Sequence, residues 1–195
     1  MPCPEAIVIG CSQGGLNALR VVLGGLDRRL PQAVLVCCHT SGNVRVLCEL
    51  LASHSPLPVI EAGERQPALG GTVYLAPGGY HLLIENNRHF SLSVDEVVRY
   101  SRPSIDVMFG SAADVYQAGL IGVVLTGANA DGADGLAQIR ARRGTAIVQS
   151  PESSDAPAMP RAALDVAGAD YSLPLEQIAS LLNRLCMPSI DLPSP

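Results

Sequence analysis

The sequence of 195 residues lacks several features that would point to common binding functions. It has no tryptophan and only two phenylalanines, so it offers no aromatic platform for stacking single-stranded nucleic acid. Its net charge of −5 argues against the basic face of a nucleic-acid-binding protein. The apolar runs are too short to span a bilayer, and the N-terminal segment lacks the basic and apolar regions of a signal peptide. We therefore expect a cytoplasmic protein that neither binds nucleic acid nor inserts into a membrane.

The cysteines are also without a recognisable metal-binding or disulfide pattern. No two of the six are separated by two residues, and most lie in or beside apolar segments. Such cysteines in a cytosolic protein are expected to be reduced and to act as small apolar side chains. We predict neither a metal site nor a cofactor. The cysteines are Cys3, Cys11, Cys37, Cys38, Cys48 and Cys186.

What the sequence does contain is an alternation of short apolar runs and amphipathic segments. Buried strands and helices in alternation are typical of βαβ units, so we predict a doubly wound, mostly parallel, Rossmann-like α/β sheet. The segment 81–94 differs, because two apolar runs flank Glu-Asn-Asn-Arg; it predicts a peripheral antiparallel β-hairpin. The predicted strands are 6–10, 33–38, 58–62, 72–78, 120–126 and 145–150, and the predicted helices lie at about 16–26, 44–51, 105–116, 134–143, 159–168 and 175–185.

Three residues are predicted to mark helix ends, and the chain is predicted to form one domain. Ser104 and Asp134 are candidate N-caps, and Gly144 is a candidate C-terminal glycine. A length of 195 residues suits one core. We expect a single domain over residues 1–188, followed by a proline-rich tail at 189–195. The sequence does not indicate an oligomeric state.

Polar residues follow three of the predicted strands where each strand ends. Ser12 lies in the turn after the first strand, His39 follows the second, and Asp131 lies in the loop after the 120–126 strand. Ligands of open α/β sheets bind at the carboxyl ends of the strands. A hydroxyl, an imidazole and a carboxylate at that edge are the components of a nucleophilic triad.

Each of these residues also has an alternative interpretation. Gly10-Cys11-Ser12-Gln13-Gly14 suits a sharp strand-to-helix turn that exposes a nucleophile, but similar turns bind phosphate in nucleotide-binding folds. The nucleotide alternative is weak, because no acidic residue ends the second strand. His39 could be an ordinary hydrogen-bonded loop residue and Asp131 a helix cap. The chain order Ser, His, Asp also differs from that of α/β-hydrolases.

Taken together, these segments resemble the catalytic domain of the bacterial chemotaxis-specific protein-glutamate methylesterases, the CheB family. The likeness runs from about residue 6 to residue 185. It is carried by His39 and by IGCSQGG (9–15), YLAPGGYHLLI (74–84), RPSIDVMFGSAA (102–113), VVLTGANADGADG (123–135) and AMPRAAL (158–164).

The resemblance implies a serine esterase with roles for particular residues. Ser12 would be the nucleophile, His39 the general base and acid, and Asp131 the orienting carboxylate. The substrate would be a glutamate γ-methyl ester on a methyl-accepting chemotaxis receptor, hydrolysed through an acyl-enzyme, and glutamine deamidation would follow the same route. We further infer an oxyanion hole or substrate-binding role for the backbone around Gln13, Gly14 and Ala128.

The sequence also departs from the pattern of this family. We expect no phosphorylatable receiver domain before the first strand. Cys38 stands where the family usually has Gln, Gly127-Ala128-Asn129 where it usually has Gly-Met-Gly, and Ala158 where it usually has Gly. Two further hypotheses therefore stay open: a non-catalytic module of the same fold that binds a receptor or another partner, and a serine hydrolase of unrelated esters.

Overall fold

A computed structural model describes residues 3–40 and 43–187 of the chain, so the predicted domain boundary at 188 and the tail at 189–195 lie outside the described residues. Its centre is a seven-stranded sheet of order β3-β4-β2-β1-β7-β8-β9, in which all adjacent strands are parallel. The predicted parallel sheet is thereby confirmed. The strands are β1 (Ala6–Cys11), β2 (Ala33–Cys38), β3 (Val59–Glu61), β4 (Val73–Leu75), β7 (Leu120–Val124), β8 (Thr145–Gln149) and β9 (Tyr171–Leu173).

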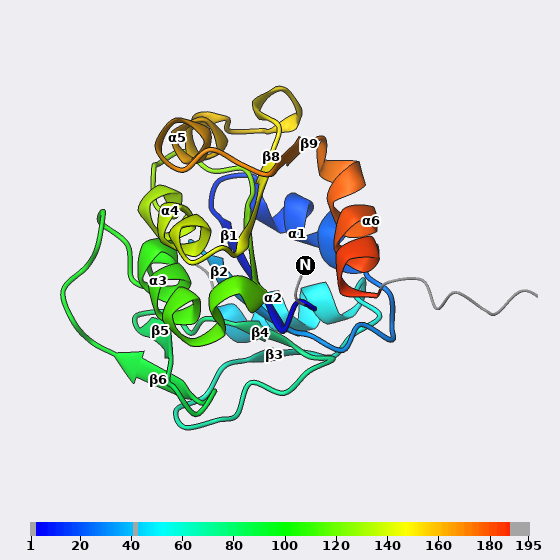
Figure 1. The fold of residues 1–195 in the computed structure, drawn as a ribbon. Coiled ribbons are helices and arrows are strands. Elements are labelled where there is room, and N and C mark those ends of the chain that lie inside the picture. Colours follow the sequence, from blue (N-terminus) through cyan, green and yellow to red (C-terminus); the bar gives the residue numbers. More distant parts are fainter. Residues whose placement is uncertain (1–2, 41–42, 188–195) are drawn as a thin grey trace, which may run out of the picture.

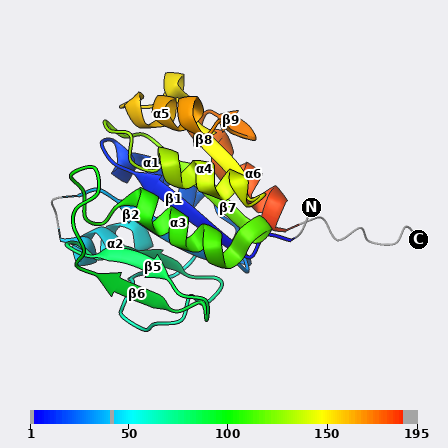
Figure 2. The ribbon, with the colours of Figure 1, turned by 60° about the vertical axis from the view of Figure 1, so that its left-hand side comes forward.

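Helices cover both faces of the sheet, as Figures 1 and 2 show. Helices α1 (Gly15–Gly24), α2 (Val44–Ala52) and α6 (Leu175–Cys186) pack on one face. Helices α3 (Ile105–Tyr116), α4 (Ala133–Ala141) and α5 (Ala158–Val166) pack on the other face. The central strands are buried throughout, which explains their continuous runs of aliphatic residues.

The predicted antiparallel hairpin is also present. Strands β5 (His81–Ile84) and β6 (Phe90–Ser93) form a separate two-stranded sheet that packs against α3. Phe90 is buried in edge contact with Tyr74 of β4, so both large aromatic rings fill the space between hairpin and sheet. In the part of the chain that the structure describes, no helix is long and apolar enough to cross a bilayer.

Two predicted helix ends are wrong, and one strand was not predicted. The residue with positive φ after α4 is Arg143 rather than Gly144. The N-cap of α4 is Gly132, which has no side chain to cap with, and Asp134 lies inside the first turn. Strand β9 is only three residues long and partly exposed, so no run of apolar residues marks it in the sequence. Ser104 caps α3 as predicted, because its hydroxyl accepts a hydrogen bond from the amide of Val107.

Candidate active site

Ser12 lies in the turn that joins β1 to α1, at the carboxyl edge of the sheet. Its amide donates to the carbonyl of Thr126 at 3.0 Å, and its carbonyl accepts from the amide of Gly15 at 2.8 Å. Gly14 adopts φ +77°, and a Cβ there would lie 2.7 Å from Asp155 Oδ2. Glycine is therefore required at this position by both conformation and space. The turn places Ser12 beside the N-terminus of α1, where free backbone amides favour negative charge.

Thr126 fixes this turn to the end of β7. Its hydroxyl is within hydrogen-bonding distance of the carbonyl of Gln13 (2.9 Å) and of the backbone of Ala156. Its own amide donates to the buried side chain of Gln149 at 2.9 Å. The nucleophile turn is thus tied to β7 and β8 as well as to β1, which limits its freedom to move.

His39 and Asp131 form a hydrogen-bonded pair beside this turn. His39 follows β2, and its amide donates to the carbonyl of Cys11 at 3.1 Å. Its Nε2 lies 2.9 Å from Asp131 Oδ2, and the two side chains are 13% and 0% exposed. With Asp131 ionised, Nε2 must carry the proton of this bond, which leaves Nδ1 as the basic nitrogen.

Asp131 also caps the N-terminus of α3. Its oxygens accept hydrogen bonds from the amides of Ile105 (2.7 Å) and Asp106 (3.0 Å) and from the hydroxyl of Ser104 (2.9 Å). Burial raises the pKa of Asp131, but the bonds from His39 and from these donors outweigh burial and lower it below its usual value. The carboxylate is therefore held in its charged form, as an orienting partner for an imidazole must be.

Asp106 caps the opposite helix in return. Its Oδ1 accepts from the amides of Gly132 (2.9 Å) and Gly135 (2.7 Å) at the N-terminus of α4, and its Oδ2 contacts Arg99. Burial, together with the nearby charge of Asp131, raises the pKa of Asp106 to about 6, although the bond from Gly135 opposes that rise. The two acids thus lock the starts of α3 and α4 together.

The basic nitrogen of His39 faces two polar side chains that the sequence did not single out. Nδ1 lies 3.4 Å from Asn129 Nδ2 and 3.5 Å from Ser101 Oγ. Asn129 Oδ1 accepts from the amide of Asp131 at 3.2 Å, which turns the amide nitrogen of Asn129 toward the ring. Neither residue could have been found from local sequence pattern, because each reaches His39 from a distant loop.

Ser12 and His39 line the same pocket, of about 280 Å³, together with Gly14 and Cys38. Within the described ranges no hydrogen bond joins Ser12 Oγ to His39. Catalytic hydrogen bonds are often long in unliganded sites and shorten when substrate binds. His39 also borders a second pocket of about 320 Å³, lined by Tyr100 and Arg102. The ring therefore stands between two open spaces.

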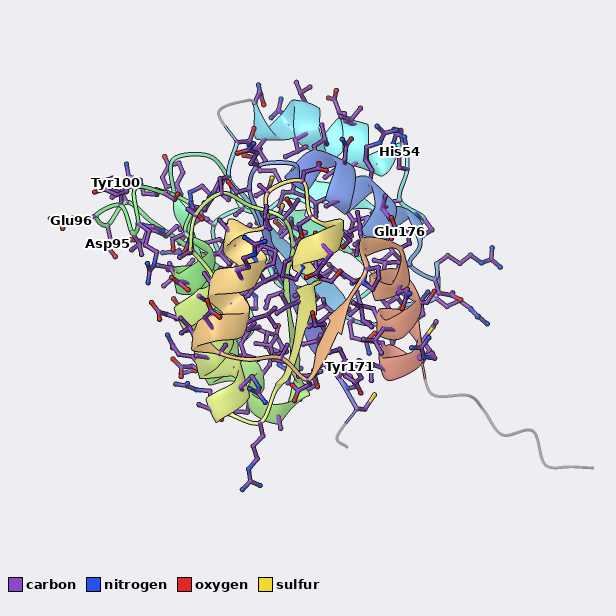
Figure 3. All side chains as sticks on the ribbon, turned by 90° about the horizontal axis from the view of Figure 1, so that it is seen from above. His54, Asp95, Glu96, Tyr100, Tyr171 and Glu176 are labelled. Carbon is purple, nitrogen blue, oxygen red and sulfur yellow. The ribbon has the colours of Figure 1, made fainter. Side chains whose placement is uncertain are left out.

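Tyr100 belongs to a loop that projects from the molecule at the edge of this second pocket. Its side chain is fully exposed, and in Figure 3 it lies with Asp95 and Glu96 at the outer margin of the fold. Arg99 in the same loop pairs with Asp106 and Asp134, which anchors the base of the loop to α3 and α4.

Backbone amides near Ser12 supply possible hydrogen-bond donors for an oxyanion. Over residues 3–40 and 43–187, the amides of Gln13, Gly14 and Ala128 donate no hydrogen bond to another group of the protein. Ala128 is an exposed residue. In the same described residues, no group of three or more His, Cys, Asp or Glu side chains has the arrangement of a metal site.

The fold and this cluster define a doubly wound α/β protein with Ser, His and Asp gathered at the carboxyl edge of its central strands. The model of the CheB methylesterase family matches residues 7–182. The chain therefore belongs to the CheB methylesterase family and is an enzyme of the carboxylic-ester hydrolase class.

Two relatives and one solved structure show how far the similarity extends. A Leptospira interrogans protein, provisionally named protein-glutamate methylesterase/protein-glutamine glutaminase, is 44% identical over 93% of this chain and 94% of its own length. A Symbiobacterium thermophilum enzyme with the same name is 37% identical over 91% of this chain, which spans only 49% of that relative. The crystal structure of the Thermotoga maritima CheB methylesterase catalytic domain superposes with a TM-score of 0.90 at 31% identity, covering 93% of this chain and 98% of that domain.

Proposed function

We propose that this protein hydrolyses glutamate γ-methyl esters on methyl-accepting chemotaxis receptors, and deamidates receptor glutamines, with Ser12 as nucleophile. The observation that carries the proposal is the 2.9 Å bond between His39 and the fully buried Asp131, beside a pocket that Ser12 shares with His39. The names of the relatives supply the substrate class.

The geometry supports a definite course for the proton. Because Asp131 occupies Nε2, Nδ1 of His39 takes the proton of Ser12 as Oγ attacks the ester carbonyl. The amides of Gln13, Gly14 and Ala128, which bond to no other group in the described residues, would bind the resulting oxyanion. His39 then protonates the leaving methoxide, methanol departs, and a glutamyl ester of Ser12 remains.

The second half of the reaction restores the enzyme. A water molecule gives a proton to Nδ1 of His39 and attacks the acyl carbon, and the proton then returns to Ser12 as the glutamate carboxylate leaves. With a glutamine side chain as substrate, ammonia leaves in place of methanol. A cytoplasmic location belongs to this proposal and is supported by the six cysteines, all of which are free thiols.

The test is methanol release from a methylated chemotaxis receptor by the unmodified protein and by two variants. Ser12→Ala should lower the rate by roughly 10⁴- to 10⁶-fold, because loss of one triad member disables the whole unit. Ser101→Ala is the matched control, since Ser101 Oγ lies 3.5 Å from His39 Nδ1, and it should keep most of the activity.

Three results would contradict the proposal. Loss of activity in Ser101→Ala and not in Ser12→Ala would move the nucleophile to Ser101. Turnover of small activated esters without methanol release from a competent receptor would assign the protein to other esters. Absence of both reactions, with no labelling of Ser12 by a fluorophosphonate, would favour a non-catalytic receptor-binding module.

A further inference from the structure

Two cysteines end the neighbouring strands that carry Ser12 and His39. Cys11 is the last residue of β1 and Cys38 the last residue of β2, and they are register partners in the parallel ladder. Neighbouring strands lie about 4.7–4.9 Å apart, which falls within the range of about 4.4–6.8 Å between Cα atoms that disulfides join. The backbone therefore already holds this pair at a separation that a disulfide spans.

The two sulfur atoms also point to the same side. A Cβ placed on Gly15 would lie 2.7 Å from Cys11 Sγ and 3.5 Å from Cys38 Sγ, so both sulfurs lie under the first residue of α1. Each thiol also shifts the pKa of the other, as expected for close neighbours. Cys37 precedes Cys38 in the sequence, but its side chain belongs to the core on the opposite face of the sheet. It therefore cannot form a disulfide with Cys11 or Cys38.

The two thiols differ in access and in acidity. Cys11 is fully buried, whereas Cys38 is partly exposed and lines the pocket that contains Ser12 and His39. The hydrogen bond with Cys11 lowers the pKa of Cys38, and burial opposes that effect. The hydrogen bond with Cys38, together with burial, raises the pKa of Cys11. Thiolates react with oxidants, so Cys38 is the thiol that an oxidant entering the pocket meets first.

We propose that Cys38 is a site of reversible oxidation by a peroxide-class oxidant, and that it closes onto Cys11 as a disulfide. The effect of this disulfide on catalysis rests on the proposed function, but its formation does not. Disulfides in reducing compartments are usually transient and redox-sensing, which fits a thiol pair beside an active site.

The chemistry balances with hydrogen peroxide as the only co-reactant. The Cys38 thiolate attacks one peroxide oxygen, the O–O bond breaks, and Cys38 sulfenic acid and hydroxide form. The Cys11 sulfur then attacks the Cys38 sulfur, the S–O bond breaks, and a second hydroxide leaves; the thiol protons turn both into water. The two thiols lose two electrons and two protons, and the peroxide is reduced to two water molecules.

The disulfide would act on the site through its immediate neighbours. Cys11 precedes Ser12 and Cys38 precedes His39, and the amide of His39 already bonds to the carbonyl of Cys11. Rotating both cysteine side chains into a disulfide would move the sulfur of Cys38 within the wall of the pocket that Ser12 and His39 line. We expect loss of activity in the oxidised form and its return on reduction.

The experiment treats the full chain with hydrogen peroxide in a Cys3→Ser background, which removes the exposed thiol. Free thiols are then alkylated, and the peptides are mapped by mass spectrometry without reduction. We expect a linked pair of peptides containing Cys11 and Cys38, reversal by dithiothreitol, and parallel loss and recovery of fluorophosphonate labelling at Ser12. Cys11→Ser should leave Cys38 as a sulfenic acid that dimedone traps.

Cys48 provides the internal comparison. It also borders a pocket, but burial and nearby Glu61 raise its pKa to about 11. Oxidation of Cys48 as fast as Cys38, or conversion of Cys38 to sulfinic acid with Cys11 left free, would overturn the proposal. Because the peptide map needs no substitution at Cys11 or Cys38 and no esterase activity, failure here is distinct from failure of the proposed function.

Discussion

Asp106 and Asp131 each cap the helix that belongs to the other. Asp131, just before α4, accepts the first amides of α3, and Asp106, in the first turn of α3, accepts the first amides of α4. Asp131 additionally holds His39. The residue proposed to orient the imidazole is therefore also a structural residue, and its substitution should be measured by both activity and stability.

Asp131→Asn should impair both properties. Loss of the charged partner of His39 is expected to lower kcat by about 10⁴-fold, as for the equivalent change in other Ser-His-Asp enzymes. Weaker capping of α3 should also reduce the free energy of unfolding by about 0.5–2 kcal/mol. Methanol release and urea denaturation measure the two effects. A variant with normal kcat would show that Asp131 serves only as a cap.

The free energy of unfolding should vary with pH because of both Asp131 and Asp106. The pKa of Asp131 lies below its usual 3.8. Its contribution to the free energy of unfolding is therefore present above pH 3.8 and is lost as the pH falls through the lower pKa of the folded state. The pKa of Asp106 is raised from 3.8 to about 6, so its contribution is full below 3.8 and is lost as pH rises through about 6.

Asp106→Asn isolates the effect of the raised pKa of Asp106, because asparagine keeps an oxygen for the amides of Gly132 and Gly135. Its free energy of unfolding should decline less than that of the parent as pH rises from about 4 to 7. Asp134→Asn is the control, since Asp134 binds the same Arg99 from an exposed position. Equal pH profiles for the parent and Asp106→Asn would refute the raised pKa.

Gly14→Ala should distort the nucleophile turn. Alanine at this position would have to adopt the left-handed backbone conformation of Gly14, at φ +77°. Its Cβ would also lie 2.7 Å from Asp155 Oδ2. Gly79→Ala is matched in backbone, at φ +81°, but has nothing within 4 Å. The control should cost about 1–3 kcal/mol for conformation alone and keep its activity. Gly14→Ala should cost more and lose labelling of Ser12; equal behaviour of the two variants would contradict this.

Asn129→Ala tests the side chain that faces the basic nitrogen of His39. The contact is 3.4 Å long, so it should contribute about 0.5–1.5 kcal/mol, or about two- to tenfold in kcat. KM should change little, because the amide acts on His39 rather than on the receptor. A rise in KM at constant kcat would instead place Asn129 in substrate binding. Steady-state kinetics on methylated receptor separate the two.

The sequence predicted the parts of the fold that depend on continuous apolar runs. Strands β1, β2 and β7 are buried on both faces, so each reads as a short apolar run, with Gly10 and Gly122 as the glycines within them. Strand β9 has one exposed and two half-buried residues and takes its place only by pairing with β8, which no local pattern reveals.

The positions of Ser12, His39 and Asp131 at strand ends followed from the same logic, and the structure places the latter two in contact. The cap of α4 could not be predicted, because its acceptor, Asp106, lies 26 residues before Gly132 and reaches it only through packing of α3 on α4. The contacts of Ser101 and Asn129 with His39 likewise depend on tertiary packing and are not marked by local sequence. Short-range spacing identifies candidate groups, but the contacts among them depend on tertiary packing.

The strand order β2-β1-β7 has a consequence for the order in which the site is completed during synthesis of the chain. Synthesis proceeds from the N-terminus, so β1 and β2 can pair while β7 is still inside the ribosome. Asp131 lies 92 residues beyond His39 and arrives only when β7 joins the free side of β1. Nascent chains that end before β7 lack this carboxylate, so the set of Ser12, His39 and Asp131 is complete only after β7 has been synthesised.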